Sequence, residues 1–151
     1  MLRSLLMVLS CLLSLLLAQA PADFEHITRQ AQGKVGVFAQ IVETGETLDF
    51  HGSERYPMQS VYKFPIAMAV LQAVDQGKLT LDTPIRVEKS DLIGGRQHSP
   101  IRDMHPDGGF TLPLRELIRY AVAESDGSAS DVLLRIVGGA PKVQAMLTRL
   151  G

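Results

Sequence analysis

Hydrophobic and polar positions change their spacing along the chain, and each spacing predicts a different element. Apolar and more neutral residues alternate over residues 35–41, and extended chain resumes over residues 47–51 after a short turn that contains Gly45. Period-two alternation on both sides of a glycine-containing turn predicts a β-hairpin. Residues 64–74 are apolar almost all round, which is typical of a helix buried on several sides, and Gly77 is placed to end that helix.

The remaining segments predict helices and loops. A short polar helix is predicted over residues 23–32, and the segment 82–110, with its paired glycines and its prolines, is predicted to be mostly loop. Three further helices are predicted over residues 112–123, 128–137 and 141–150. The fold class is therefore α+β, with two strands followed mostly by helices.

The predicted hairpin lacks an evident partner. A lone two-stranded hairpin is marginal in water and leaves unpaired edges. No convincing strand pattern follows residue 51, and the sequence stops at Gly151 directly after a predicted helix. We therefore expect a truncated chain, without the strands that would complete the sheet.

The first twenty residues have the layout of a secretory signal peptide. Arg3 supplies a positive start, residues 5–17 form a leucine-rich run, and Ala18-Gln19-Ala20 offers a small-residue cleavage site. A membrane anchor would need about twenty apolar residues, more than this run provides. Cys11 within the run also leaves a lipoprotein open. We expect cleavage after Ala20 and export to the periplasm.

Composition and charge exclude several classes of protein. With 46% hydrophobic and 21% charged residues, the chain is too apolar to be disordered. Its length suits one domain, which we place at residues 21–151 after the signal peptide at residues 1–20. The 15 basic and 16 acidic side chains give no general attraction to nucleic acid or to an anionic membrane. The single cysteine excludes a disulfide framework and a cysteine-based zinc site.

The loop-rich segment contains histidines and aspartates that could suggest a metal site: His98, Asp103, His105 and Asp107. No histidine pair among them has the spacing of a metal-binding motif. A solvated loop is the simpler interpretation, and we expect neither a metal ion nor another cofactor.

The first candidate for chemistry is Ser60-Val61-Tyr62-Lys63, at the start of the most apolar helix. A serine hydroxyl becomes a good nucleophile when a base lies within hydrogen-bond reach. Positions i and i+3 share a face at a helix start, so Lys63 can lie beside the Ser60 oxygen. Burial lowers the pKa of a lysine and makes its neutral amine accessible near pH 7, while the helix N-terminus can stabilise an oxyanion. The alternative is a capping serine followed by a surface lysine.

The second candidate is Ser125-Asp126-Gly127, between two predicted helices. A second hydroxyl close to a serine–lysine pair can pass a proton to a leaving nitrogen. The alternative is an N-cap, in which Ser125 or Asp126 starts the following helix.

Taken together, these motifs resemble the class A serine β-lactamases, whose signature includes Ser-x-x-Lys and Ser-Asp-Asn. The segments that carry the resemblance cover nearly all of the chain after residue 20 and comprise residues 60–65, 99–101, 114–117, 121–129, 133–134 and 137–139. Gln59 and the long loop over residues 90–110 are closer to the extended-spectrum, PER/VEB-like branch of that family.

The resemblance implies a β-lactamase/transpeptidase-like fold, of which this chain has the N-terminal hairpin and most of the helical part. It implies a monomeric periplasmic enzyme that hydrolyses a small-molecule β-lactam and so gives antibiotic resistance. Ser60 would attack the lactam carbonyl to form an acyl-enzyme, and its backbone N–H would supply half of the oxyanion hole. Lys63 would be its proton partner, and Ser125 would protonate the lactam nitrogen. Ser99 and Gly127 would border the substrate.

Two departures from the family pattern affect these expectations. Gly127 replaces the usual asparagine, which removes a side-chain amide that would contact the lysine and the substrate. The family's glutamate loop and its Lys-Thr-Gly strand are expected beyond Gly151, so we expect the 151-residue chain to be inactive by itself. Two alternatives therefore stay open: a D-Ala-D-Ala peptidase or penicillin-binding protein that keeps its adduct, and a truncated, non-enzymatic remnant.

Overall fold

The computed structural model describes residues 24–151, which fall into a first compact unit ending at Pro57 and a second spanning Met58–Gly151. The predicted signal peptide and its cleavage site lie outside the described residues. Within residues 24–151, no helix combines the length and the apolar character needed to cross a bilayer.

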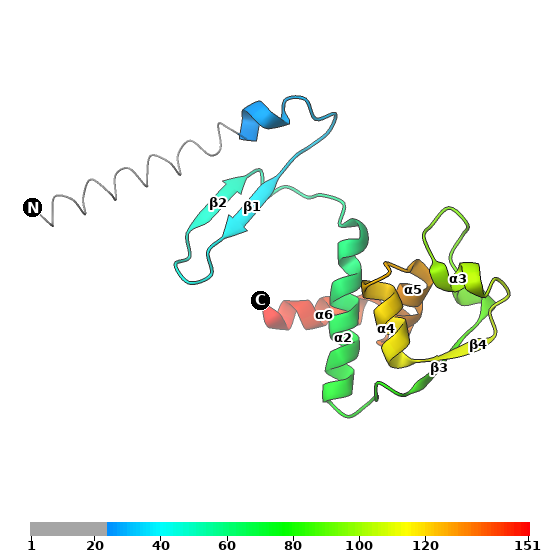
Figure 1. Ribbon diagram of the computed structural model, residues 1–151. Coiled ribbons are helices and arrows are strands. Elements are labelled where there is room, and N and C mark those ends of the chain that lie inside the picture. Colours follow the sequence, from blue (N-terminus) through cyan, green and yellow to red (C-terminus); the bar gives the residue numbers. More distant parts are fainter. Residues whose placement is uncertain (1–23) are drawn as a thin grey trace, which may run out of the picture. The chain divides into compact units, whose positions relative to one another are not determined.

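The first unit contains the predicted hairpin. Strand β1 (Val37–Gln40) pairs antiparallel with β2 (Thr47–Phe50), in a register that places Val37 opposite Phe50 (Figure 1). The turn between them is closed by Gly45, whose φ of 74° suits a residue without a side chain. Residues 24–28 are helical, so the predicted polar helix is shorter than expected, and its Phe24 stacks on Phe50.

The second unit carries most of the helices. Its elements, in chain order, are the 3₁₀ turn η1 (Gln59–Tyr62), α2 (Lys63–Asp75), β3 (Pro84–Val87), the 3₁₀ turn η2 (Lys89–Asp91), α3 (Pro100–Met104), β4 (Phe110–Pro113), α4 (Leu114–Val122), α5 (Gly127–Ile136) and α6 (Ala140–Leu150). The four longer helices confirm the four predicted after the hairpin, with ends that differ by a few residues.

Helix α2 is the centre of the second unit, packing against α4, α5 and α6 (Figure 1). Val70 of α2, Leu117 of α4 and Leu133 of α5 are fully buried in one core cluster, and burying a side chain of this size contributes about 1.5–3 kcal/mol. The helix ends as predicted. Gly77, at φ 69°, donates to the carbonyl of Val74, and the next N–H reaches back to Ala73.

The prediction that no strand follows residue 51 was wrong, whereas residues 82–110 are mostly loop, as predicted. Strands β3 and β4 form a second antiparallel pair, and Val87 of β3 is fully buried. Each strand has only four residues, and Pro84 lies opposite Pro113 across the pair. Prolines argue against a strand assignment in a sequence, yet they are tolerated at strand ends and sheet edges. The predicted helix over residues 112–123 begins two residues later because Leu112 and Pro113 belong to β4.

Candidate active site

Ser60 and Lys63 lie at the junction between η1 and α2. Ser60 is exposed, whereas Lys63, the first residue of α2, is only 6% exposed. Gln59, directly before the serine, has a φ of 48°, in the left-handed region that non-glycine residues rarely adopt. The chain therefore enters α2 through a strained residue, and that entry presents the Ser60 hydroxyl to solvent while it directs the lysine inward.

Ser125 connects these two side chains. Its Oγ donates a hydrogen bond to Ser60 Oγ at 2.9 Å. Lys63 Nζ donates to Ser125 Oγ at 3.1 Å and to the Ser125 carbonyl oxygen. Lys63 thus reaches Ser60 through the second hydroxyl, in the order ammonium, Ser125, Ser60. Residues that are 65 positions apart in sequence are brought into one chain of hydrogen bonds.

Burial lowers the pKa of Lys63 below its ordinary value of 10.5. The negative charges of Asp126 and Asp131 act in the opposite direction and raise it. Desolvation is the larger effect because it removes the water that would stabilise the ammonium form. The neutral amine, which can accept a proton, is therefore more accessible than in a solvated lysine.

The turn that carries Ser125 is strained, and the buried side chain of Asp126 stabilises it. Ser125 has a φ of 54°, and the next residue, Asp126, is fully buried. Asp126 is the N-cap of α5, since its Oδ1 accepts from the backbone N–H of Ala129 at 2.9 Å. The capping interpretation therefore holds for Asp126, and the same turn places the Ser125 hydroxyl beside Ser60.

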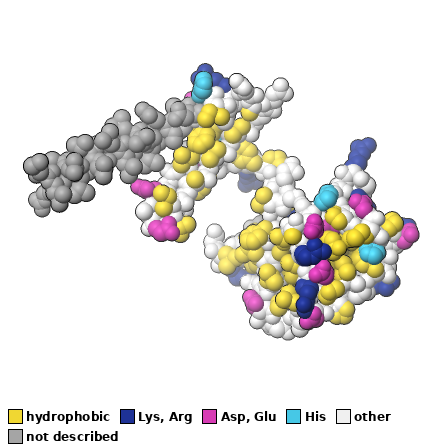
Figure 2. Space-filling view, viewed as in Figure 1, with side chains coloured by type: hydrophobic (Ala, Val, Ile, Leu, Met, Phe, Trp, Pro, Cys, Tyr) yellow, Lys and Arg dark blue, Asp and Glu magenta, His cyan; other side chains and the backbone are white. Residues whose placement is uncertain are grey.

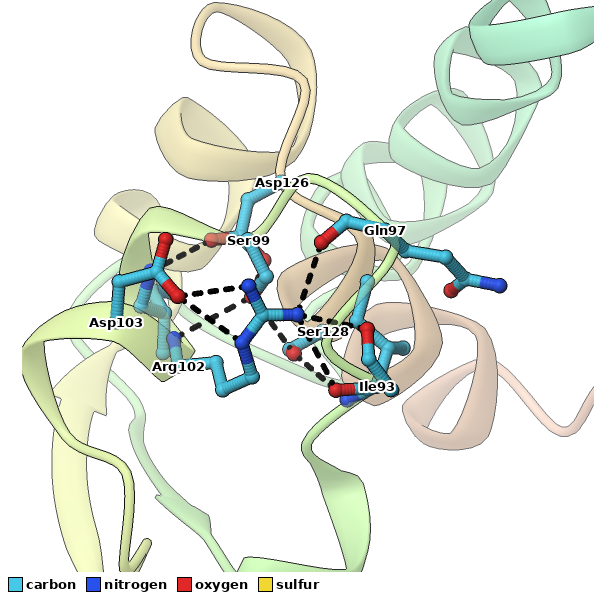
Figure 3. A network of polar contacts seen from close by, with 9 residues as sticks. Ile93, Gln97, Ser99, Arg102, Asp103, Asp126 and Ser128 are labelled. Carbon is cyan, nitrogen blue, oxygen red and sulfur yellow. Dashed lines mark hydrogen bonds and ion pairs between the residues drawn. The ribbon is translucent and has the colours of Figure 1, made fainter.

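Gly127 and Ser99 lie on either side of a contact between this turn and the segment before α3. The Gly127 N–H donates to the carbonyl of His98 at 3.0 Å. A Cβ at position 127 would lie 2.2 Å from Cδ1 of Ile93, so the Ile93 side chain occupies the space of a larger residue there. Ser99 is fully buried, and its hydroxyl donates to Asp126 Oδ1 at 2.9 Å and lies 2.8 Å from Ser128 Oγ (Figure 3).

The histidines and aspartates of the loop-rich segment make separate contacts. His98 Nε2 lies 2.9 Å from the carbonyl oxygen of Glu124, and His105 stacks on Phe110. Asp103 and Asp107 pair with Arg102 and Lys89, respectively. Within residues 24–151, no three His, Cys, Asp or Glu side chains come together in a way that could hold a metal ion.

The arrangement has the components of nucleophilic catalysis at a carbonyl carbon. Ser60 offers an exposed hydroxyl, Ser125 can transmit a proton, and Lys63 can receive one. On the face of the second unit seen in Figure 2, basic and acidic side chains are interspersed rather than gathered by sign. Sequence reasoning did not find two contributors to this arrangement, Asp126 as the buried support of the turn and Ile93 as the residue opposite Gly127.

Comparison with known proteins identifies the family. A model of the β-lactamase enzyme family matches residues 19–151. The chain is 34% identical over 150 residues to β-lactamase VEB-1 from Pseudomonas aeruginosa, covering 96% of this chain and 50% of that protein. It is also 34% identical over 137 residues to the extended-spectrum β-lactamase PER-1 of the same organism, covering 89% of this chain and 44% of the relative.

Solved structures agree with this assignment. A β-lactamase from Chitinophaga pinensis superimposes with a TM-score of 0.78 at 40% identity, covering 89% of this chain and 48% of that one. The extended-spectrum β-lactamase TLA-1 gives a TM-score of 0.79 at 36% identity, covering 87% of this chain and 47% of its own. The chain spans about half the length of the relatives it matches. This chain belongs to the β-lactamase enzyme family, and the class A extended-spectrum β-lactamases VEB-1, PER-1 and TLA-1 are among its relatives.

Proposed function

We propose that this chain carries the acylation site of a serine β-lactamase. The observation that supports the proposal is the hydrogen-bonded series Lys63, Ser125, Ser60, with a buried lysine at one end and an exposed hydroxyl at the other. The relatives VEB-1 and PER-1 are β-lactamases by name, and a strained cyclic amide is a carbonyl substrate that such a series can attack.

In the proposed reaction, Ser60 Oγ forms a bond to the lactam carbonyl carbon and the amide C–N bond of the ring breaks. The Ser60 proton passes through Ser125 to the neutral amine of Lys63, and Ser125 then supplies a proton to the leaving nitrogen. The N–H of Ser60, in the turn that leads into α2, supplies one donor for the oxyanion. Water releases the acyl group from Ser60 and completes hydrolysis.

Ser99 and Gly127 take different parts in this proposal. Gly127 follows the Ser125 turn and borders the substrate with backbone and with the neighbouring Ile93, since it has no side chain of its own. Ser99 contributes through the loop that it anchors, because its hydroxyl is turned inward to Asp126. The proposed substrate is a small-molecule β-lactam, bound without a metal ion or cofactor.

Export is the setting in which this function would give antibiotic resistance. We infer that residues 1–20 direct the chain to the periplasm and are removed there. Sequencing the N-terminus of the protein recovered from the periplasm tests the inference. We expect Pro21 as the first residue, whereas an intact Met1 or a lipidated Cys11 would contradict it.

The test of the acylation site is a mass adduct on Ser60. The 151-residue chain is incubated with benzylpenicillin and examined by intact-protein mass spectrometry, beside Ser60→Ala and the matched control Ser90→Ala. Ser90 is an exposed serine in η2. We expect a slowly formed adduct in the parent chain and in the Ser90 variant, since a single acylation needs Ser60, Lys63 and Ser125 but not repeated turnover, and none in the Ser60 variant.

In a protein that also contains a deacylating glutamate loop, the fate of the adduct distinguishes the enzyme classes. A protein mass that returns promptly to the unmodified value supports a β-lactamase, provided that more moles of opened lactam form than there are moles of protein. An adduct that persists for hours supports a penicillin-binding protein of the D-Ala-D-Ala peptidase type. If no adduct forms with any β-lactam, the proposed acylation by this chain is wrong.

A further inference from the structure

His98, in the segment before α3, makes hydrogen bonds with the residues before and after Ser125. Ahead of Ser125, the carbonyl oxygen of Glu124 lies 2.9 Å from His98 Nε2. Behind it, the Gly127 N–H donates to the carbonyl of the same His98 at 3.0 Å. The strained φ of Ser125 therefore lies between two contacts made by one residue of a neighbouring loop.

Further hydrogen bonds, largely buried, join the segment before α3 to Asp126 and Ser128. The Asp126 carboxylate accepts from the Ser99 hydroxyl at 2.9 Å and from the Ile101 N–H at 2.7 Å, so it holds the end of the loop and the start of α3 (Figure 3). Ser128 Oγ accepts from the Ile93 N–H at 3.1 Å, at the other end of the same loop. Residues 93–101 and the turn at Ser125 are thus joined at several points.

The loop itself is held in shape by one side chain, Arg102. Its Nη1 lies 2.8 Å from the carbonyl oxygens of both Gly94 and Gln97 and 3.4 Å from that of Ile93 (Figure 3). Asp103 orients the guanidinium by accepting from its Nε and Nη2 at 3.0 and 2.7 Å. Because the loop includes two consecutive glycines, which have no side chains of their own to fix it, these contacts define its path.

We propose that Arg102 is a positioning residue for Ser125, which it reaches through the 93–98 loop. The inference rests on the proposed acylation by Ser60. Arg102 fixes the loop, the loop places His98, and His98 holds both sides of the strained turn. Without Arg102, the loop relaxes and Ser125 loses the conformation that directs its hydroxyl to Ser60.

This role predicts a selective defect, because Ser125 is needed most where the leaving atom must be protonated. A β-lactam nitrogen leaves only when it receives a proton, whereas p-nitrophenolate leaves from an ester without one. A displaced Ser125 interrupts the relay from Ser60 to Lys63 and so slows acylation by both substrates. It slows acylation by a β-lactam more, because the ring nitrogen must also receive a proton. A general loss of structure would slow both alike.

The experiment compares Arg102→Gln, Arg102→Lys and Arg96→Gln in the 151-residue chain. Arg96 is an exposed arginine of the same loop, so its variant makes the identical chemical change without removing the loop contacts. Acylation of Ser60 by benzylpenicillin and by p-nitrophenyl acetate is followed by mass spectrometry, with Ser60→Ala as the background.

For Arg102→Gln, we expect acylation by both substrates to fall, with the loss for benzylpenicillin at least about tenfold larger than the loss for the ester. Arg96→Gln leaves both rates unchanged, and Arg102→Lys recovers part of the loss because an ammonium can still donate to some of the three carbonyls. Equal slowing of both reactions by Arg102→Gln, or no slowing, overturns the positioning role.

A second measurement tests the positioning role of Arg102 even if no variant is acylated. Amide hydrogen exchange of Gly127 reports its hydrogen bond to His98 directly. We expect protection of this amide to fall at least tenfold in Arg102→Gln relative to Arg96→Gln, with the amides of α4 unchanged. If no variant forms an adduct but this pattern appears, the proposed function fails and the positioning by Arg102 stands. Unchanged exchange at Gly127 contradicts the positioning.

Discussion

The charge state of Lys63 governs the proposed chemistry at the residue scale. Because burial holds the pKa of Lys63 below 10.5, its amine loses its proton at a lower pH than the amine of a solvated lysine does. We expect the rate of Ser60 acylation to rise with pH and to level off once Lys63 has lost its proton. Rates measured from pH 6 to pH 10 check this expectation.

Lys63→Arg is the informative variant, because a guanidinium keeps its proton throughout this range. It should acylate at least about a hundredfold more slowly, with a flat pH profile, since general base catalysis contributes 10²–10⁴-fold. Lys78→Arg, the same change at an exposed position beyond α2, serves as the control. If Lys63→Arg retains the parent profile, the amine is not the proton acceptor.

Gly127 and Ile93 allow a second test at the residue scale, because the Ile93 side chain fills the space that a side chain at position 127 would need. In Gly127→Ala, the new Cβ meets Ile93 Cδ1 at 2.2 Å, and overpacking of this kind costs about 1–3 kcal/mol. Ile93→Val removes that carbon, so the double variant should recover most of the loss in the free energy of unfolding. Chemical denaturation of both single variants and the double variant measures the coupling.

The control for this pair is Gly95→Ala, at a position where an added Cβ would have no neighbour within 4 Å. It should change the free energy of unfolding by less than about 0.5 kcal/mol. Strict additivity of Ile93→Val and Gly127→Ala would show that the two residues do not compete for space.

At the scale of elements, two carboxylates of α5 and its N-cap interact electrostatically with Lys63 of α2. Asp126 and Asp131 both raise the pKa of Lys63, against the effect of burial. Asp131→Asn removes one of these charges, so the pKa of Lys63 should fall further. We expect the pH profile of acylation to shift to lower pH, with a higher rate at neutral pH. No shift, or a shift to higher pH, would contradict the coupling.

Asp75→Asn is the matched control for that variant. Asp75 ends α2, about 18 Å along the helix from Lys63 at 1.5 Å per residue. This separation exceeds the screening length of about 8 Å at physiological ionic strength. The same loss of charge there should leave the pH profile in place, so that a shift in Asp131→Asn reports a local effect.

The sequence predicted elements where periodicity was sustained, and failed where it was short. The apolar run of α2 and the alternation around Gly45 were sufficient for the main helix and the hairpin. Strands β3 and β4 were missed because four residues bounded by prolines carry too little pattern. Ser60, Lys63 and Ser125 were found as motifs. The contacts of Arg102 depend on how a glycine-containing loop folds back, which no local pattern encodes.

At the scale of the whole molecule, the two compact units differ in what they bury. Among the described residues of the first unit, Phe50 is the single buried hydrophobic side chain, whereas the buried core cluster belongs entirely to the second unit. An isolated two-stranded hairpin is marginally stable in water. The stability of the described chain should therefore come mainly from α2, α4, α5 and α6.

Hydrogen–deuterium exchange by mass spectrometry tests this difference, because amides in locally unstable regions open with a small free energy and exchange early. We expect the amides of β1 and β2 to exchange at least a hundredfold faster than those of α2 and α5, although both sets are hydrogen-bonded. Such a ratio corresponds to an opening free energy about 2.8 kcal/mol lower in the hairpin, since each tenfold step is about 1.4 kcal/mol. Equal protection of hairpin and helices would mean that the first unit draws stability from contacts beyond its own small core.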